Sequence, residues 1–197
     1  MRVMSALVVT ALTGIATAQP LPDPQIDYWT VPWENSRPRD PDLDRSGVVW
    51  FVGQTGDYVA SFDPKNEQFK KIDLDKGSGP HNLIVGEDHS IWYSGNPAAH
   101  IGRLDPKTRQ VKEWLPPTGE KARPYAMAID DRGRIWFADS GAQPNRLMAF
   151  DPKSEQFVVD TELTNARGAV RHMVFHKPGR ALWFGTDTNY LVRVKVP

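Results

Sequence analysis

The chain has 197 residues, enough for one domain with a substantial hydrophobic core, and its 24 basic residues balance its 24 acidic residues. Nucleic acid is not an expected partner, because phosphate binding requires a basic surface and the sequence has no Lys/Arg run. The sequence has no cysteine, so the core must hold the fold without disulfides.

The first 18 residues have the composition of a secretory signal peptide. Arg2 provides a positive start, "VMSALVVTALTGIA" is too short to span a bilayer, and Ala16-Thr17-Ala18 offers small residues to a signal peptidase. We therefore expect residues 1–18 to be removed, leaving residues 19–197 as a secreted or periplasmic protein with no membrane attachment. An uncleaved membrane anchor is the alternative.

Residues 26–33, "IDYWTVPW", are the first predicted strand. They resemble a later segment, "QVKEWLPP" (residues 110–117), which the pattern below predicts to be the outermost strand of a sheet. The N-terminal segment is therefore expected to serve as an outermost strand as well.

Four related copies follow. Each contains an aromatic pair, and the pairs begin at Trp50, Trp92, Trp136 and Trp183, which are 42, 44 and 47 residues apart. A period of this length, built from short alternating apolar runs and turn residues, is typical of β-propeller blades with four antiparallel strands each. The sequence thus predicts an all-β propeller of four blades: residues 37–78, 79–122, 123–168, and 169–197 together with 26–33.

The second copy shows the expected strands most clearly. They cover residues 81–86, 90–95, 100–105 and 110–115, with turn residues between them. An Asp-Pro-Lys triplet recurs at Asp63, Asp105 and Asp151, where Asp and Pro are expected to shape the turn between the third and fourth strands. The four Trp residues are expected to pack between neighbouring blades.

The two ends of the sequence complement each other. The last copy stops after "NYLVRVKVP", which resembles a third strand, and the N-terminal segment offers the missing fourth one. We therefore expect residues 26–33 to pair with residues 191–196 and to close the ring, which would remove an exposed sheet edge. Because four blades are the small end of the known range, self-association of two chains into a larger ring is the alternative.

The sequence resembles the virginiamycin B lyase (streptogramin lyase) family of β-propellers. The resemblance extends from about Asp27 to Pro197 and rests on "RPRDP", "VWFVGQTGDYVASFDPK", "GPHNLIV", "IWYSGNPAAHIGRLDPKT", "IWFADSGAQPNRLMAFDPK" and "VRHMVF". Members of the family usually have seven blades, so this chain resembles a shortened member that lacks about three blades from the middle.

The resemblance implies a reaction and a cofactor. In the family, a His removes the proton α to a carbonyl of a cyclic depsipeptide antibiotic, the ester opens by elimination, and Mg²⁺ held by acidic residues stabilises the developing charge. The family's His follows Glu-Pro, whereas His81 follows Gly-Pro and His172 follows Val-Arg. Both histidines therefore lack the acidic residue two positions earlier that is the expected metal ligand.

The copies differ at the start of the innermost strand, where the blades of a propeller converge on the central channel. The first differing position holds Arg39, His81, Tyr125 and Arg171, and the next holds Asp40, Asn82, Ala126 and His172. We predict His172 and His81 as catalytic candidates, and Arg39, Asp40, Asn82, Tyr125 and Arg171 as ligand-binding residues. Asp139 is the predicted Mg²⁺ ligand, with Asp40 as the other nearby carboxylate. As an alternative, any one of these residues serves only to cap a loop.

The sequence leaves several functions open. The first is a secreted lyase-like propeller that opens an ester of a cyclic depsipeptide-type substrate with help from Mg²⁺. The alternative is a non-catalytic propeller that binds a small molecule, glycan or peptide at the same rim. A metal-dependent lactonase is a third candidate, disfavoured by the few acidic residues at the rim.

Overall fold

The computed structural model describes residues 21–165 and 167–197. The predicted signal peptide, residues 1–18, lies outside this range. Residues 21–30 belong to a separate N-terminal unit, form no strand and are exposed, while all fifteen strands of the described chain lie in the unit Val31–Pro197. None of the helices in the described ranges has the length and apolarity needed to cross a bilayer.

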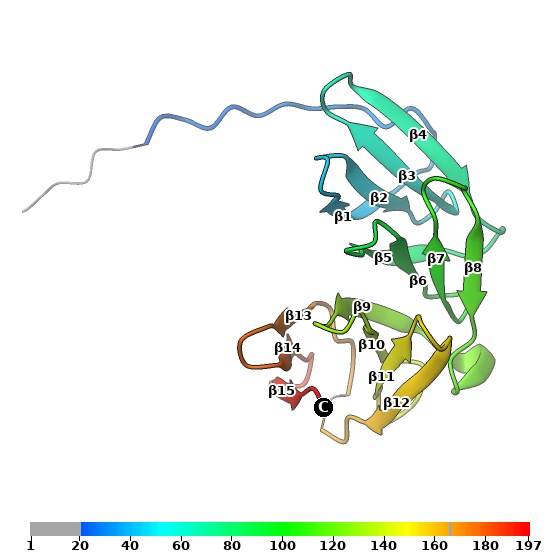
Figure 1. Ribbon diagram of the computed structural model, residues 1–197, viewed down its shortest axis with the longest axis vertical. Helices are drawn as coiled ribbons and strands as arrows, with labels where there is room; N and C mark the ends of the chain where they lie inside the picture. The colour runs from blue at the N-terminus through cyan, green and yellow to red at the C-terminus, as the bar shows by residue number, and fades with distance from the viewer. Residues whose placement is uncertain (1–20, 166) are drawn as a thin grey trace, which may run out of the picture. The chain divides into compact units, whose positions relative to one another are not determined.

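The strands form four antiparallel sheets, each a consecutive stretch of the chain (Figure 1). We call these sheets blades 1 to 4. Blade 1 contains β1 (Pro38–Leu43), β2 (Val49–Gly53), β3 (Tyr58–Asp63) and β4 (Gln68–Asp73). Blade 2 contains β5 (Pro80–Val85), β6 (Ile91–Gly95), β7 (His100–Leu104) and β8 (Val111–Trp114).

A single 3₁₀ turn among the described residues, η1 (Gly119–Lys121), leads from blade 2 into blade 3. Blade 3 contains β9 (Pro124–Ile129), β10 (Ile135–Asp139), β11 (Arg146–Asp151) and β12 (Gln156–Glu162). Blade 4 has three strands: β13 (Met173–His176), β14 (Ala181–Gly185) and β15 (Leu191–Lys195). The predicted all-β propeller architecture with four blades is thereby confirmed.

The observed strand boundaries follow the turn chemistry. In blade 2 each strand agrees with its predicted range to within one residue. The Asp-Pro-Lys triplets join the third and fourth strands of blades 1 to 3, as predicted, and each Asp accepts a backbone N–H two residues on: Asp63 from Lys65 at 3.0 Å, Asp105 from Lys107 at 2.8 Å, and Asp151 from Lys153 at 3.0 Å. These carboxylates therefore build turns.

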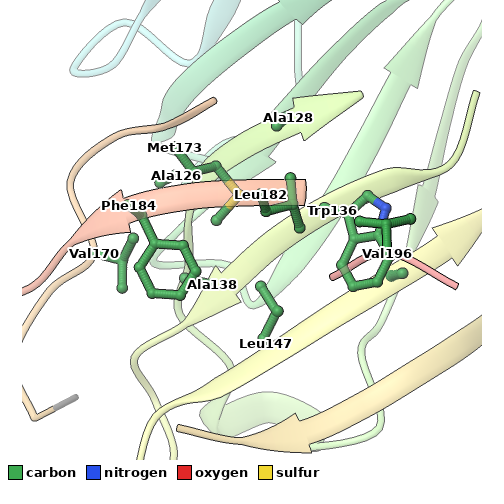
Figure 2. Close-up of a cluster of buried hydrophobic side chains, with 11 residues drawn as sticks. Ala126, Ala128, Trp136, Ala138, Leu147, Val170, Met173, Leu182, Phe184 and Val196 are labelled. Carbon is green, nitrogen blue, oxygen red and sulfur yellow. The ribbon is translucent and has the colours of Figure 1, made fainter. Parts of the chain in front are cut away.

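Apolar side chains fill the spaces between consecutive blades. In each of these spaces, the first residue of an aromatic pair packs against the following blade. Trp50 packs in a cluster with residues of blade 2, Trp92 with residues of blade 3, and Trp136 with Leu182 and Phe184 of blade 4. Figure 2 shows the last of these clusters, in which Leu182 and Phe184 lie beside Ala138 and Leu147. The predicted role of the Trp residues between blades is confirmed for these three.

The prediction for residues 26–33 is wrong: no strand forms there, and blade 4 has no fourth strand among the described residues. Val31 and Trp33 instead pack against the cluster of blade 1, where the Trp33 ring lies 5.1 Å from the ring of Tyr58 and 6.1 Å from that of Phe69. Burial of a large aromatic ring outweighs the strand preference of this short segment, and Pro32 has no N–H for a sheet.

Candidate functional site

The candidate site is built at the start of the innermost strand of each blade. Arg39 and Asp40 lie on β1, His81 and Asn82 on β5, and Tyr125 on β9. Strand pairing shifts register between Arg39 and Asp42 in β1 and between Pro80 and Leu83 in β5. A bulge of this kind redirects side chains, and here it lies at the predicted site residues in both strands.

Asp40 and Asn82 connect blades 1 and 2. The Asn82 Nδ2 donates to Asp40 Oδ2 at 3.1 Å, and the Asn82 backbone N–H donates to Ser94 Oγ at 3.1 Å. Asn82 is buried, and Asp40 adopts a positive φ of 44°. The Asp40 carboxylate thus has an amide partner, and the two predicted ligand-binding residues form one unit.

His81 and Tyr125 connect blades 2 and 3. Their ring centroids lie 4.0 Å apart, and His81 is only 7% exposed. Burial lowers the pKa of His81 from its ordinary 6.5 to about 4, with a further lowering by the charge of Arg39 and a smaller opposing effect of Asp40. His81 is therefore a neutral imidazole at neutral pH.

Tyr125 also lies near Arg171, which precedes β13 of blade 4. The Asp187 carboxylate, first, and the Tyr125 hydroxyl, second, raise the pKa of Arg171. Arg171 Nη2 and Nε donate to the two Asp187 oxygens at 3.1 and 3.3 Å, and Asp187 also accepts the Ala169 N–H at 3.1 Å. Arg171 is thus brought to the site with its charge already paired.

Three buried polar atoms at the site have no hydrogen-bond partner: Arg39 Nε, His81 Nδ1 and Asn82 Oδ1. They make up three of the five such side-chain atoms found in the described part of the chain. The only side-chain hydrogen bond of Arg39 within that part is a long one, from Nη1 to Gln54 Oε1 at 3.4 Å. Because buried polar groups are almost always paired, this concentration marks a place for a ligand or for water.

The other predicted residues are not part of this group. His172 lies just before β13 and its side chain is exposed. Asp139 is fully buried at the end of β10, where it accepts hydrogen bonds from the Thr118 hydroxyl, the Arg123 N–H at 2.6 Å and the Gly141 N–H at 2.8 Å. This carboxylate holds loops together.

The donor set does not fit Mg²⁺, which prefers several oxygen ligands in an octahedral arrangement. Asp139 is occupied by its three donors, Asp187 by Arg171, and Asp40 by Asn82. Over residues 21–165 and 167–197, no three His, Cys, Asp or Glu side chains gather closely enough to hold a metal ion. We therefore derive no chemical step through a metal.

A cavity of about 990 Å³ lies at the opposite ends of the inner strands. It is lined by residues that include Val85, Ile129, Phe175 and Lys177, with Asp88 and Asp130 from the turns that follow β5 and β9. These two carboxylates hold the Trp92 and Trp136 indoles, Asp88 through Ser90 and Asp130 directly. The cavity therefore does not share the chemistry of the candidate site.

Comparison of the four repeat copies did not identify Gln54 and Asp187, which are the hydrogen-bond partners of Arg39 and Arg171. Both follow the second strand of their blade, Gln54 after Gly53 and Asp187 two residues after Gly185. The copies also differ at this place, where residues 54, 96, 140 and 186 are Gln, Asn, Ser and Thr. Aligning the four copies on the residues that follow the aromatic pair would have identified this region.

No protein-family profile matches the sequence, and no curated protein matches it. Several solved structures, by contrast, are similar to this chain. A catalytically inactive His-to-Ala variant of virginiamycin B lyase from Staphylococcus aureus with quinupristin superposes with a TM-score of 0.72 at 20% identity, over 86% of this chain and 59% of that one. A streptogramin B lyase gives 0.70 at 23% identity, over 85% and 57%. The chain has the β-propeller fold of these lyases.

Other propellers are similar too. YCF48 bound to a D1 peptide superposes with a TM-score of 0.64 at 14% identity, over 80% of this chain and 50% of that one. The chain spans less than two thirds of each of these proteins. At such identities the likeness establishes the fold, and the activity has to be argued from the site.

Proposed function

We propose that this protein is an exported, lyase-like β-propeller that binds a peptide-like ligand at the site formed by Arg39, His81, Asn82 and Tyr125. The observation that carries the proposal is the group of three unpaired buried atoms on two adjacent inner strands. Burying such groups unpaired costs about 1–3 kcal/mol each, so a ligand that pairs with them gains affinity.

The chemistry of the three atoms indicates the ligand class. Arg39 Nε carries an N–H and requires an acceptor, whereas Asn82 Oδ1 is an acceptor and requires a donor. A peptide or depsipeptide backbone offers both, a carbonyl oxygen and an amide N–H, and the Tyr125 ring beside His81 adds an aromatic surface. Propellers of similar fold that bind quinupristin or a D1 peptide support this class.

Calorimetric titration with quinupristin, and separately with a mixture of linear peptides, tests the proposal. Arg39→Lys keeps the charge but removes the Nε donor, and we expect it to weaken binding at least about tenfold. Arg103→Lys is the matched control, because Arg103 Nε is equally unpaired but lies on β7, away from the site. Equal affinities for both variants and the wild type, or no binding of either probe, contradict the proposal.

Elimination at an ester of the bound ligand is the second candidate function, and the state of His81 favours it. A neutral imidazole with an unpaired Nδ1 can take the proton from a carbon α to a carbonyl, when the neighbouring β carbon carries the ester oxygen. The electron pair of the broken C–H bond forms a C=C bond between the α and β carbons, the bond from the β carbon to oxygen breaks, and the carboxylate leaves with that bond's electrons. In this proposal the Arg39 guanidinium would hold the carbonyl oxygen as charge develops on it.

Mass spectrometry of quinupristin after incubation distinguishes the outcomes. Elimination opens the ring without a change in mass and creates a new C=C absorbance, whereas hydrolysis adds one water. We expect His81→Phe, which keeps an aromatic ring against Tyr125, to lower turnover about 10²- to 10⁴-fold. If quinupristin binds but stays unaltered, elimination is contradicted and only the ligand-binding function is supported.

A further inference from the structure

The cavity at the opposite ends of the inner strands has an apolar floor that the repeat builds. Val85 ends β5, Ile129 ends β9 and Phe175 is the last residue but one of β13, so the three hold one position of the repeat. Each of them is half-buried. The volume of about 990 Å³ lies within the range of pockets for small organic ligands, which combine an apolar lining with a few polar groups.

The carboxylates around this floor already have partners in the protein. Five carboxylates line the cavity, and the fifth along the chain, Asp151, accepts the Lys153 N–H at 3.0 Å and the Ser154 hydroxyl at 3.2 Å. The other four pair with guanidinium groups: Glu87 with Arg45 at 4.0 Å, Asp88 with Arg103 at 2.9 Å, Asp130 with Arg134 at 2.7 Å, and Asp131 with Arg180 at 3.3 Å. Four of the five negative charges are therefore balanced within the chain.

Three cations of the same lining are not balanced. Arg132 lies in the turn between β9 and β10, Lys153 in the turn between β11 and β12, and Lys177 directly after β13. Their side chains are exposed and form no hydrogen bond or ion pair with any residue that the structure describes. The cavity thus combines an apolar floor with an excess of positive charge.

Two buried N–H groups add to this excess of donors. Within the described part of the chain, Arg103 Nε and Arg180 Nε are the two unpaired buried side-chain atoms outside the candidate site. The same guanidinium groups hold Asp88 and Asp131 of the cavity lining, and that of Arg103 lies 5.8 Å from the ring of Trp92, another lining residue. Because these unpaired groups are donors, the ligand that completes them has to supply acceptors.

We propose that this cavity binds a small organic anion with an apolar body. The apolar body would lie on Val85, Ile129 and Phe175, and the anionic group would accept hydrogen bonds from Lys153 and Lys177. Hydrogen bonds between an ammonium group and an anionic oxygen are stronger than those between neutral groups. The inference is independent of the proposed function, because the cavity lining and the candidate site share no residue.

Two fluorescent probes with the same rings test the proposal on the full chain. 1-Anilinonaphthalene-8-sulfonate carries a negative charge, whereas N-phenyl-1-naphthylamine does not. We expect Lys153→Gln together with Lys177→Gln to weaken binding of the sulfonate at least about threefold and to leave binding of the uncharged amine unchanged. Lys65→Gln together with Lys107→Gln is the matched control. These two exposed lysines hold the place of Lys153 in the Asp-Pro-Lys triplets of blades 1 and 2, and neither lines the cavity.

Methyl NMR locates the bound sulfonate. The Ile129 methyl resonances should shift when the probe is added, because an aromatic ring next to them changes their shielding. Those of Ile72, a half-buried isoleucine on β4 that does not line the cavity, should stay in place. Static Ile129 resonances overturn the proposal, as does an equal loss of sulfonate affinity in both double variants or no loss in either. An equal loss of affinity for the uncharged amine also overturns it, because the lysines would then act through the shape of the cavity and not through their charge.

Discussion

At the scale of single residues, buried carboxylates mostly serve the fold. Asp130 illustrates this: its Oδ2 accepts the Trp136 indole N–H at 2.8 Å, and its Oδ1 accepts the backbone N–H of Arg132 and Arg134 at 2.9 and 3.0 Å. Burial alone would raise the pKa of Asp130, but these hydrogen bonds hold it below its usual range. Asp44 repeats the arrangement with the Trp50 indole, so the recurring Asp and Trp form a structural pair.

Asp139 provides a test of whether a carboxylate near the rim binds metal or braces loops. We expect Asp139→Ala to lower the free energy of unfolding by about 2–4 kcal/mol, because the N–H groups of Arg123 and Gly141 lose their buried acceptor. EDTA should leave the melting temperature of the wild type unchanged. A fall in melting temperature with EDTA that is absent in Asp139→Ala would instead identify a metal ligand.

His81 should make stability depend on pH. The folded protein protonates His81 only near pH 4, whereas the unfolded chain does so near its ordinary value of 6.5, so the unfolded state binds more protons between these values. The contribution of neutral His81 is complete above pH 6.5 and is lost as the pH falls to 4, by about 1–3 kcal/mol. Urea titrations of the wild type and His81→Phe should show this loss in the wild type only. Parallel curves for the two proteins would rule out a buried neutral His81.

At the scale of strands, glycines at the end of the second strand accommodate large rings. Gly53 pairs with Tyr58 across β2 and β3, and Gly95 pairs with His100 across β6 and β7. A Cβ on Gly53 would lie 2.0 Å from the Tyr58 ring, which is fixed by Trp33 and by a hydrogen bond to Ser36. The glycine thus allows an aromatic ring to cover the strand end.

Gly53→Ala should therefore destabilise the protein by about 1–3 kcal/mol through overpacking. Gly185→Ala is the matched control at the same place in blade 4, where nothing lies within 4 Å of a Cβ, and it should change stability by less than about 0.5 kcal/mol. Thermal or urea unfolding of the two variants makes the comparison. Equal effects would mean that the strand backbone, and not the Tyr58 ring, sets the cost.

The strands could be predicted from the sequence because turn residues and the alternation of apolar and polar residues are local signals. The strands of blade 2 agree with their predicted ranges to within one residue at each end. The role of Trp33 could not be predicted from the sequence, because its ring packs on Tyr58 and Phe69, which lie on strands some 25 to 36 residues later. The convergence of Arg39, His81, Asn82 and Tyr125 followed from the repeat. Their hydrogen bonds, and the pairing of Arg171 with Asp187, depend on loops whose geometry the repeat does not fix.

At the scale of the whole molecule, the cover over blades 1 and 4 is expected to determine the order in which the blades unfold. Inside the chain each blade is stabilised by its neighbours, as in other repeat proteins, so the terminal blades depend on whatever covers them. Blade 1 has Val31 and Trp33 over its aromatic cluster, whereas Trp183 and Val174 of blade 4 remain partly or largely exposed. Blade 4 is therefore expected to open first, and among the strands hydrogen exchange should be fastest in β13 to β15. Equal exchange rates in all four blades would contradict this order.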